Sequence, residues 1–498
     1  MPPRTLSCNR VTASSCPEMK VSDRIRMRSR LTRLMGFGFS LLITMPIWCQ
    51  TENELQREPV LGSAGVIKNT TPDSNINDTS HLGDRMLTPP LVGGQFYPTV
   101  PTSTERSNYL RYGVLFTTAY TDNVLGGFSG RPIGDATYSI APTAALDVTT
   151  SRMHWQADYA PGFTFYQRIS ARKDADHSAT IDFQYRLSPH ATLSAGDNFL
   201  RSSSVFHQYD LGSIDPVSGG TQVTNASVIV PIADRLRNSA NVGLTDQFAL
   251  NEMIGASGTF TNLHYPNPAQ VSGLYDSSSQ SASAFFSRRV AQVHYVGITY
   301  QYQRLVAQPT QSVSETQTQA AMLFYTFFPS TRFSLSFFGG SQYSHTVQPT
   351  LSPSQAQLPE TKTWTPAAGA SLNWQGRLTA VALSYSHMIT PGSGLVGAVY
   401  QDSGTLSLKR QIRRTLNGSL SWGYAQNNYV GNAVLANNGH SIFGTASLEH
   451  QFVEHMNVQI GYTRIHQTYS GVPVLSLNPD TNRAFVSISY QFSRPLGR

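Results

Sequence analysis

The chain has 498 residues, 40% of them hydrophobic, with 36 Lys and Arg against 29 Asp and Glu. Eight of the basic and two of the acidic residues lie in the first 50, so 28 basic and 27 acidic residues remain in the rest of the chain. The formal net charge of +7 therefore comes almost entirely from the first 50 residues, and it does not indicate nucleic-acid binding by the rest of the chain. All three cysteines also lie in the first 50 residues, which excludes a disulfide, a cysteine-ligated metal or a thiol nucleophile from the part that follows.

The N-terminus has the pattern of a secretory signal. A cluster of arginines precedes a short apolar run from Leu34 to Trp48. A basic region followed by a short apolar region is typical of a signal peptide, and the run is too short to be preferred as a membrane-spanning helix. We therefore predict a signal peptide over residues 1–50, with Met27 or Met35 as alternative starts.

The next segment, residues 51 to about 105, is rich in Thr, Pro, Asn, Ser and Gly and shows no sustained hydrophobic period. This composition is typical of a chain segment that does not bury a core of its own. We predict a flexible periplasmic N-terminal arm over residues 51–105, with too few residues for a globular plug. Binding of a partner by this arm is left open.

From residue 106 onward, apolar and polar residues alternate along nearly the whole chain; residues 484–492, for example, read Ala-Phe-Val-Ser-Ile-Ser-Tyr-Gln-Phe. Successive side chains of a strand point to opposite faces, so one face is mainly apolar and the other mainly polar. About 18 such segments, with no helical period between them, exceed the seven to nine strands of a soluble sandwich. A closed barrel pairs every backbone N–H and C=O in lipid without a free edge. We predict an all-β fold over residues 106–498, a transmembrane antiparallel up-and-down β-barrel of about 18 strands, with 16 as the alternative.

The expected connections between these strands alternate in length. Short links are expected near residues 150–152, 188–190, 251–252, 290–291, 329–331, 375–377, 410–413 and 453–455, and long ones near 122–135, 167–176, 201–235, 266–276, 305–312, 346–361, 389–396, 426–437 and 468–482. Outer-membrane barrels alternate short periplasmic turns with longer extracellular loops. Eight short turns and nine long loops join 18 strands and put both barrel ends on the periplasmic side.

Polar residues of two neighbouring strands are the candidates for lining a pore. They share the positions that alternate with apolar residues: His154, Gln156, Asp158, Asp182, Gln184 and Arg186. Charged rings in a water-filled pore set its ion preference. The alternative, in which these groups pair across neighbouring strands and only fill a polar interior, stays open.

The longest expected loop, residues 201–235, contains a run that is unusually apolar for an exposed loop. We predict that this loop folds inward and forms a constriction, with Arg235 and Arg237 at the junction of loop and lumen. The apolar candidates are Val228, Ile229, Val230, Pro231 and Ile232. The competing interpretation is an apolar surface plug or an extra hairpin.

Four short segments resemble those of Gram-negative outer-membrane β-barrel proteins, and more narrowly the uncharacterised porin-like barrels of acidobacteria. They are Tyr-Thr-Asp-Asn-Val at 120–124, Pro-Ile-Ala-Asp at 231–234, Asn-Leu-His-Tyr-Pro-Asn-Pro at 262–268 and Val-Ser-Ile-Ser-Tyr-Gln-Phe at 486–492. The resemblance covers residues 105–492. It implies a place in the bacterial outer membrane, contact with its lipid, and assembly by the barrel-assembly machinery through Tyr490 and Phe492. Six residues follow Phe492, a departure from chains that end on the terminal aromatic.

Three patterns of catalysis and nucleotide binding, G-x-S-x-G, H-E-x-x-H and G-x-x-x-x-G-K-[ST], are missing from the sequence. We therefore predict no enzymatic activity, no cofactor, no metal and no nucleic-acid partner. The leading hypothesis is a porin-like channel for passive diffusion of small polar solutes, with a homo-oligomer left open. The alternatives are the barrel component of an exopolysaccharide export or surface-attachment system and, third, an outer-membrane hydrolase.

Overall fold

A computed structural model of the chain describes Met86 and residues 108–125, 131–169, 173–204, 232–267, 273–308, 313–330, 332–347, 360–391, 395, 398–430, 438–470 and 479–496. None of these residues lies in a helix, and so the described chain contains no helix long and apolar enough to cross a membrane. The predicted signal peptide lies outside these residues. Met86 is the one described residue of the predicted N-terminal arm.

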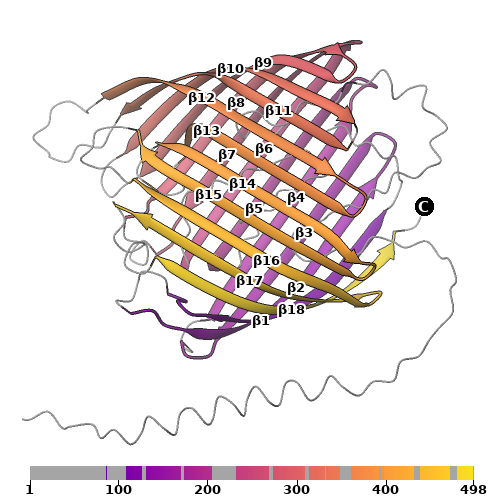
Figure 1. The fold of residues 1–498 in the computed structure, drawn as a ribbon, viewed down its shortest axis with the longest axis vertical. Coiled ribbons are helices and arrows are strands. Elements are labelled where there is room, and N and C mark those ends of the chain that lie inside the picture. The colour runs from indigo at the N-terminus through magenta and orange to yellow at the C-terminus, as the bar shows by residue number, and fades with distance from the viewer. Residues whose placement is uncertain are drawn as a thin grey trace, which may run out of the picture. The chain divides into compact units, whose positions relative to one another are not determined.

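In the described residues, eighteen antiparallel strands form one sheet that closes on itself (Figure 1). They are β1 (Tyr109–Thr121), β2 (Asp135–Thr149), β3 (Met153–Tyr166), β4 (Lys173–Arg186), β5 (Ala191–Ser204), β6 (Ile232–Ala249), β7 (Glu252–His264), β8 (Asp276–Ala291), β9 (His294–Gln308), β10 (Ser314–Ser330), β11 (Phe333–Val347), β12 (Glu360–Gln375), β13 (Thr379–Pro391), β14 (Ala398–Arg413), β15 (Leu416–Tyr429), β16 (Gly439–Val453), β17 (Met456–Tyr469) and β18 (Asp480–Pro495). Each strand pairs with the next along the chain, and β1 pairs with β18 as well as with β2. The predicted up-and-down barrel is confirmed, with 18 strands rather than 16.

The period of two in the sequence sets the two faces of the barrel wall. On β9, Val296, Ile298 and Tyr300 are exposed on the outer face, whereas Thr299 and Gln301 between them are buried on the inner face. Every strand contributes in the same way, because successive side chains of a strand point to opposite faces. The wall therefore has an apolar outer face and a largely polar inner face.

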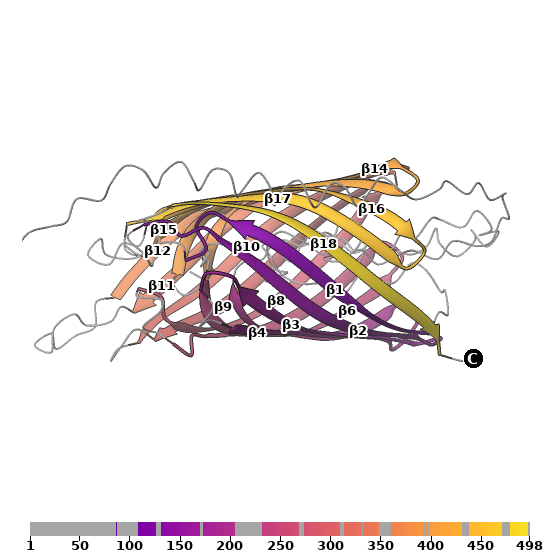
Figure 2. The same ribbon diagram turned by 90° about the horizontal axis from the view of Figure 1, so that it is seen from below.

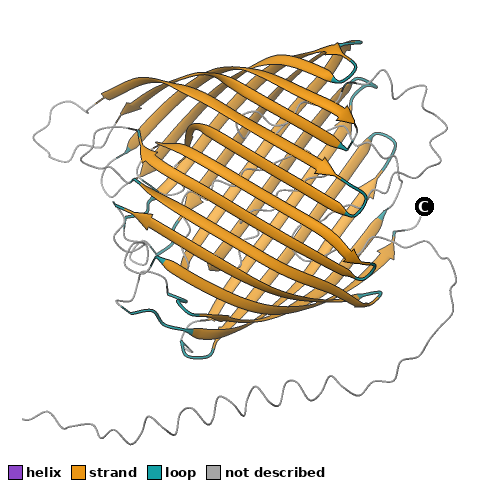
Figure 3. Cartoon of the chain, viewed as in Figure 1, coloured by secondary structure: helices purple, strands orange, loops and turns teal. Residues whose placement is uncertain are grey.

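Connections of two lengths alternate around the barrel, as predicted. Eight connections of two to four residues lie at the end where β18 finishes, which we call the turn rim (Figure 3). At the opposite end, the loop rim, nine pairs of consecutive strands end with five to 27 residues between them in sequence. Both described ends of the barrel chain are at the turn rim. There the Leu496 N–H donates a hydrogen bond to the Asn108 carbonyl at 2.8 Å.

The first and last strands lie side by side and close the barrel (Figure 2). Their ladder runs from Thr121 opposite Arg483 to Tyr109 opposite Pro495. β18 therefore continues past Phe492, because β1 offers backbone partners for the residues that follow it. The Phe492 ring stacks on Tyr112 across the two strands, with centroids 5.2 Å apart. Recognition of Tyr490 and Phe492 by an assembly machinery stays a prediction.

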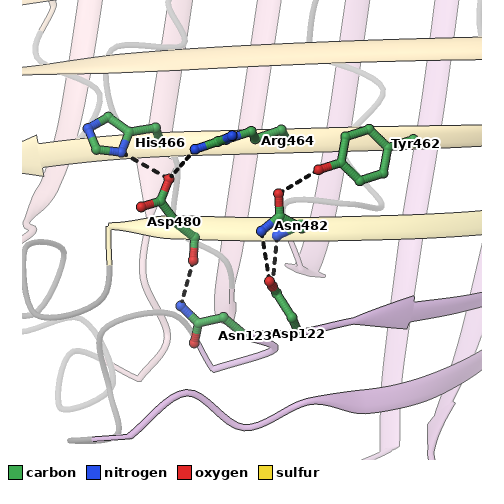
Figure 4. A network of polar contacts seen from close by, with 7 residues as sticks. All are labelled: Asp122, Asn123, Tyr462, Arg464, His466, Asp480 and Asn482. Atoms are coloured by element: carbon green, nitrogen blue, oxygen red, sulfur yellow. Dashed lines mark hydrogen bonds and ion pairs between the residues drawn. The ribbon is translucent and has the colours of Figure 1, made fainter.

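Side chains strengthen this closure near the loop rim (Figure 4). Asp122, just after β1, accepts hydrogen bonds from the backbone N–H and the side-chain amide of Asn482, each at 2.7 Å. The Asn482 amide oxygen accepts in turn from the Tyr462 hydroxyl at 2.6 Å. The end of β1 is thus tied to β18 and, through it, to β17.

Candidate functional site: the lumen wall

The inner face of the barrel consists mainly of Ser, Thr, Asn and Gln side chains that hydrogen-bond across neighbouring strands. The hydroxyls of Ser257 and Ser283 lie 2.8 Å apart, and the Gln401 amide donates to Asn427 at 3.0 Å. Buried polar groups need such partners, and this pattern supplies them within the wall. A wall of this composition can be wetted by an aqueous lumen.

Charged side chains of the inner face are concentrated on β1–β6, a region that we call the charged sector. Its inward-facing members, judged by their alternation with exposed apolar residues, include Arg111, Asp147, His154, Asp158, Asp182, Arg186, Arg235 and Arg237. On β7–β13, Arg289 is the only charged residue at an inward position in the described part of the wall. Arg289 binds turn residues at the turn rim, donating to the Asn251 amide oxygen at 2.8 Å. Lys409, Glu449 and Arg483 are further inward charged residues, on β14, β16 and β18. Apart from Arg289, the described part of β7–β13 therefore carries no inward charge.

The six residues proposed from the sequence as pore lining all lie in the charged sector. His154, Gln156 and Asp158 on β3 alternate with the exposed Trp155 and Tyr159. Asp182, Gln184 and Arg186 occupy the equivalent inward positions of β4, where the exposed Ile181 and Leu187 mark the outer face. The strand register brings these two sets together, with Gln156 opposite Asp182 and His154 opposite Gln184.

Within the charged sector, some of these groups hydrogen-bond to one another. A ring nitrogen of His154 lies 3.1 Å from an Asp147 carboxylate oxygen, and the Gln156 amide donates to Asp158 at 3.0 Å. Asp182 instead leans over Gly196 of β5, where a Cβ would lie 2.7 Å from its carboxylate oxygen. The missing side chain at Gly196 leaves the Asp182 carboxylate room on the lumen surface.

The constriction predicted from the loop over 201–235 falls mostly outside the described residues. Val228, Ile229, Val230 and Pro231 are not described, and Ile232 is described only as the first backbone position of β6. Arg235 and Arg237 follow on β6 at inward positions near the loop rim, because they alternate with the outward positions that include the exposed Val242 and Leu244. The inward loop stays a prediction.

Sequence reasoning missed that several aromatic residues face inward. Each lies directly opposite a glycine of the neighbouring strand: Gly255 and Phe285, Gly297 and Phe324, Gly369 and Phe338, Gly423 and Phe443, Gly461 and Phe485. In all five pairs a Cβ on the glycine would collide with the ring. The rings therefore lie against the wall over the glycines. The available sequence signal was the break in alternation, such as Phe-Phe at 285–286 and Met-Leu-Phe-Tyr at 322–325.

Some of the inward apolar residues gather into one cluster near the turn rim. It contains Met253, Phe285, Tyr295, Ala320, Met322, Phe324 and Ala367 from β7–β12, together with Met86. Met86 precedes the barrel strands in sequence, yet all of its barrel neighbours in this cluster have inward parity. The inner face of β7–β12 thus carries an apolar surface with a residue from the N-terminal part of the chain on it.

Histidine–carboxylate pairs lie on the outer face close to the loop rim. Four such pairs join strands that flank long loops: His264 with Asp276, His345 with Glu360, His387 with Asp402 and His466 with Asp480, with N–O distances from 2.6 to 3.3 Å. They alternate with inward residues and share the face of the apolar band. In the described residues, no group of three or more His, Cys, Asp and Glu is arranged to hold a metal.

This chain is similar to several solved structures. The chain matches Pseudomonas aeruginosa OccK2 (OpdF) with a TM-score of 0.38 and 12% identity over 78% of this chain and 98% of that one. It matches the outer membrane protein OpdK of the same organism with a TM-score of 0.36 and 9% identity over 77% and 99%. The ferric citrate transporter FecA, unliganded, has a TM-score of 0.39 and 8% identity over 75% of this chain and 61% of its own.

No protein-family model and no curated protein sequence matches this chain. The similar solved structures include outer-membrane proteins, with TM-scores below 0.5. The acidobacterial resemblance stays an expectation, and no solute or activity is carried over from any of these structures.

Proposed function

We propose that this protein is an outer-membrane channel through which small polar solutes diffuse passively. The observation that supports the proposal is the combination of a closed 18-stranded wall, an apolar outer face and a polar inner face. The outer face suits lipid, where every backbone group must be paired within the wall. Barrels of this size commonly leave an aqueous interior, and the polar inner face suits one.

The charged sector is the basis of the proposed solute preference. It brings carboxylates such as Asp158 and Asp182 and cations such as Arg186 and Arg237 to one side of the lumen. Charges on the wall of a narrow passage act strongly on a solute inside it, because water screens them less there than in bulk. The proposed mechanism is a size filter with a lateral field and contains no covalent step.

Single-channel recording in a planar bilayer tests the proposal. We expect refolded protein to give stable conductance steps. Asp182→Asn should shift the cation-to-anion permeability ratio toward anions, because it removes a lumen carboxylate, and Arg186→Gln should shift it toward cations. Reversal potentials in a salt gradient measure both changes.

A matched control uses the same substitution on the other face of the wall. Asp197 of β5 lies directly opposite the outward-facing Ile181. Asp197→Asn should therefore leave ion selectivity unchanged. Equal selectivity in wild type, Asp182→Asn and Arg186→Gln would remove these residues from the permeation path.

The barrel component of an export or attachment system is the rival function, and Met86 is the observation that favours it. A residue from before the first strand, held on the lumen side of the wall, suits a passage that a partner opens. Folded barrels that stay silent in the bilayer, yet conduct when Met86 is replaced, would move the assignment to this class.

A further inference from the structure

Met86 lies inside the barrel, although residues 87–107 separate it in sequence from the next described residue, Asn108. Only 3% of it is exposed. Its backbone N–H donates to the Gln247 side-chain oxygen at 3.0 Å, and the Gln247 amide donates to the Leu250 carbonyl in the following turn at 3.1 Å. Gln247 is itself buried and at an inward position of β6. The polar contact therefore places Met86 on the lumen side of the wall, near the turn rim.

The side chain of Met86 packs among inward apolar residues that we call the Met86 socket. The socket consists of Met253, Phe285, Tyr295, Ala320, Met322, Phe324 and Ala367, none of them more than 4% exposed. Phe328 and Phe338 pack against its edge. Methionine fits such a site, because its thioether is flexible and makes favourable contacts with aromatic rings.

The socket is an apolar area on an inner face that is otherwise mainly polar. The inner face elsewhere carries mainly Ser, Thr and Gln, and the charged sector lies on β1–β6. Apolar surface that faces an aqueous lumen is unfavourable, because water hydrates it poorly. A methionine of the same chain that covers this surface removes the cost, and the hydrogen bond to Gln247 fixes where the backbone passes.

We infer that the Met86 socket is a docking site for Met86 of the same chain, and that docked Met86 narrows the lumen beside β7–β12. Release of Met86 would widen the passage and expose the socket. The docking stands on the contacts alone, whereas the effect on permeation rests on the proposed function. Separate experiments therefore test the two parts.

Thiol protection in the full chain tests the docking. No cysteine lies beyond residue 50, so Met86→Cys introduces a single thiol into that part. In the folded barrel we expect a charged, water-soluble thiol reagent to label it about tenfold or more slowly than in denaturant, because labelling then requires local opening. Ser151→Cys, in the exposed turn between β2 and β3, is the control and should label rapidly in both states.

Two outcomes of the labelling decide the docking. Slow labelling that becomes fast when Gln247→Ala or Phe324→Ala is added would support it, provided that heat-dependent gel mobility shows a folded barrel. Labelling of Met86→Cys as fast as that of Ser151→Cys would overturn it.

Conductance of the full chain tests the narrowing. Met86→Gln has nearly the same shape but puts an amide in the apolar socket, so we expect larger single-channel steps than in wild type. Met86→Leu keeps an apolar side chain and should conduct like wild type. Met153→Gln, on the outer face at the turn rim, is the control and should change nothing.

Equal steps in wild type and Met86→Gln would overturn the narrowing even if the thiol is protected. If no variant conducts, the channel proposal fails together with the narrowing. The labelling result still decides the docking in that case.

Discussion

Asp197 places a carboxylate on the apolar outer face of the wall. It lies between Ile181 and Ala240 in the register of β4, β5 and β6, on the face that carries the exposed apolar band. A carboxylate on a lipid-facing position is costly, less so than Lys or Arg and less so near the interface. Ionisable residues in a membrane usually have a specific partner or role.

Replacement of Asp197 by Leu should stabilise the barrel if this position faces lipid. We expect the free energy of unfolding to rise by about 1–2 kcal/mol, measured by urea unfolding from lipid vesicles. Asp197→Asn should give a smaller gain, because an amide is still polar. A loss of stability in Asp197→Leu would instead mean that the carboxylate meets a partner in the bilayer, for example a second copy of this chain.

At the scale of elements, the five glycine–phenylalanine pairs explain how the wall can hold inward aromatic rings. Each ring covers the bare backbone of a glycine on the next strand. Directly opposite side chains are the unit of stabilisation between strands, and an aromatic ring over a glycine is one of its forms. The rings then add apolar contact within the wall instead of crossing the lumen.

The pair of Gly423 and Phe443 allows a matched test, because Gly444 follows Phe443 directly and lies on the other face of the wall. Gly423→Ala puts a methyl group into the Phe443 ring, and overpacking of this kind costs about 1–3 kcal/mol. Gly444→Ala adds the same methyl on the outer face, where the nearest atom is 4.0 Å away, and should change stability by less than about 0.5 kcal/mol. Equal urea midpoints for the two variants would contradict the close packing.

At the scale of the whole molecule, closure depends on β1 and β18, which are joined by no loop. Their ladder and the contacts of Asp122 with Asn482 hold the first strand to the last (Figure 4). A barrel that opened there would expose two strand edges in lipid, where unpaired backbone groups are costly. The loss of side-chain contacts between β1 and β18 should therefore lower the stability of the whole barrel.

Asp122→Ala should lower the temperature at which the folded band is lost in heat-dependent gel mobility. It removes two hydrogen bonds to a carboxylate, which together are worth about 1–3 kcal/mol. Asn267→Ala breaks a similar bond, to Asp234 at 2.7 Å, away from the closing strands. That control should lose much less stability, and a loss equal to that of Asp122→Ala would argue against a special role for the closing strands.

The sequence allowed the barrel, the 18 strands and the alternation of short and long connections to be predicted, because a period of two and turn residues are local signals. It also pointed to the parity of His154 and Asp182, which follows from the neighbouring Trp155 and Ile181. It could not reveal the Met86 contact, since Met86 and Gln247 are 161 positions apart in the sequence. The same holds for ring positions such as Phe443, because the partner glycine is on another strand.

Single-channel conductance of refolded wild-type protein, recorded beside Met86→Gln, is the most direct test of a channel with a polar lumen. We expect stable steps in wild type, larger steps in Met86→Gln, and a shift toward anion permeability when Asp182 loses its charge. Folded barrels that conduct in neither form would contradict the channel proposal.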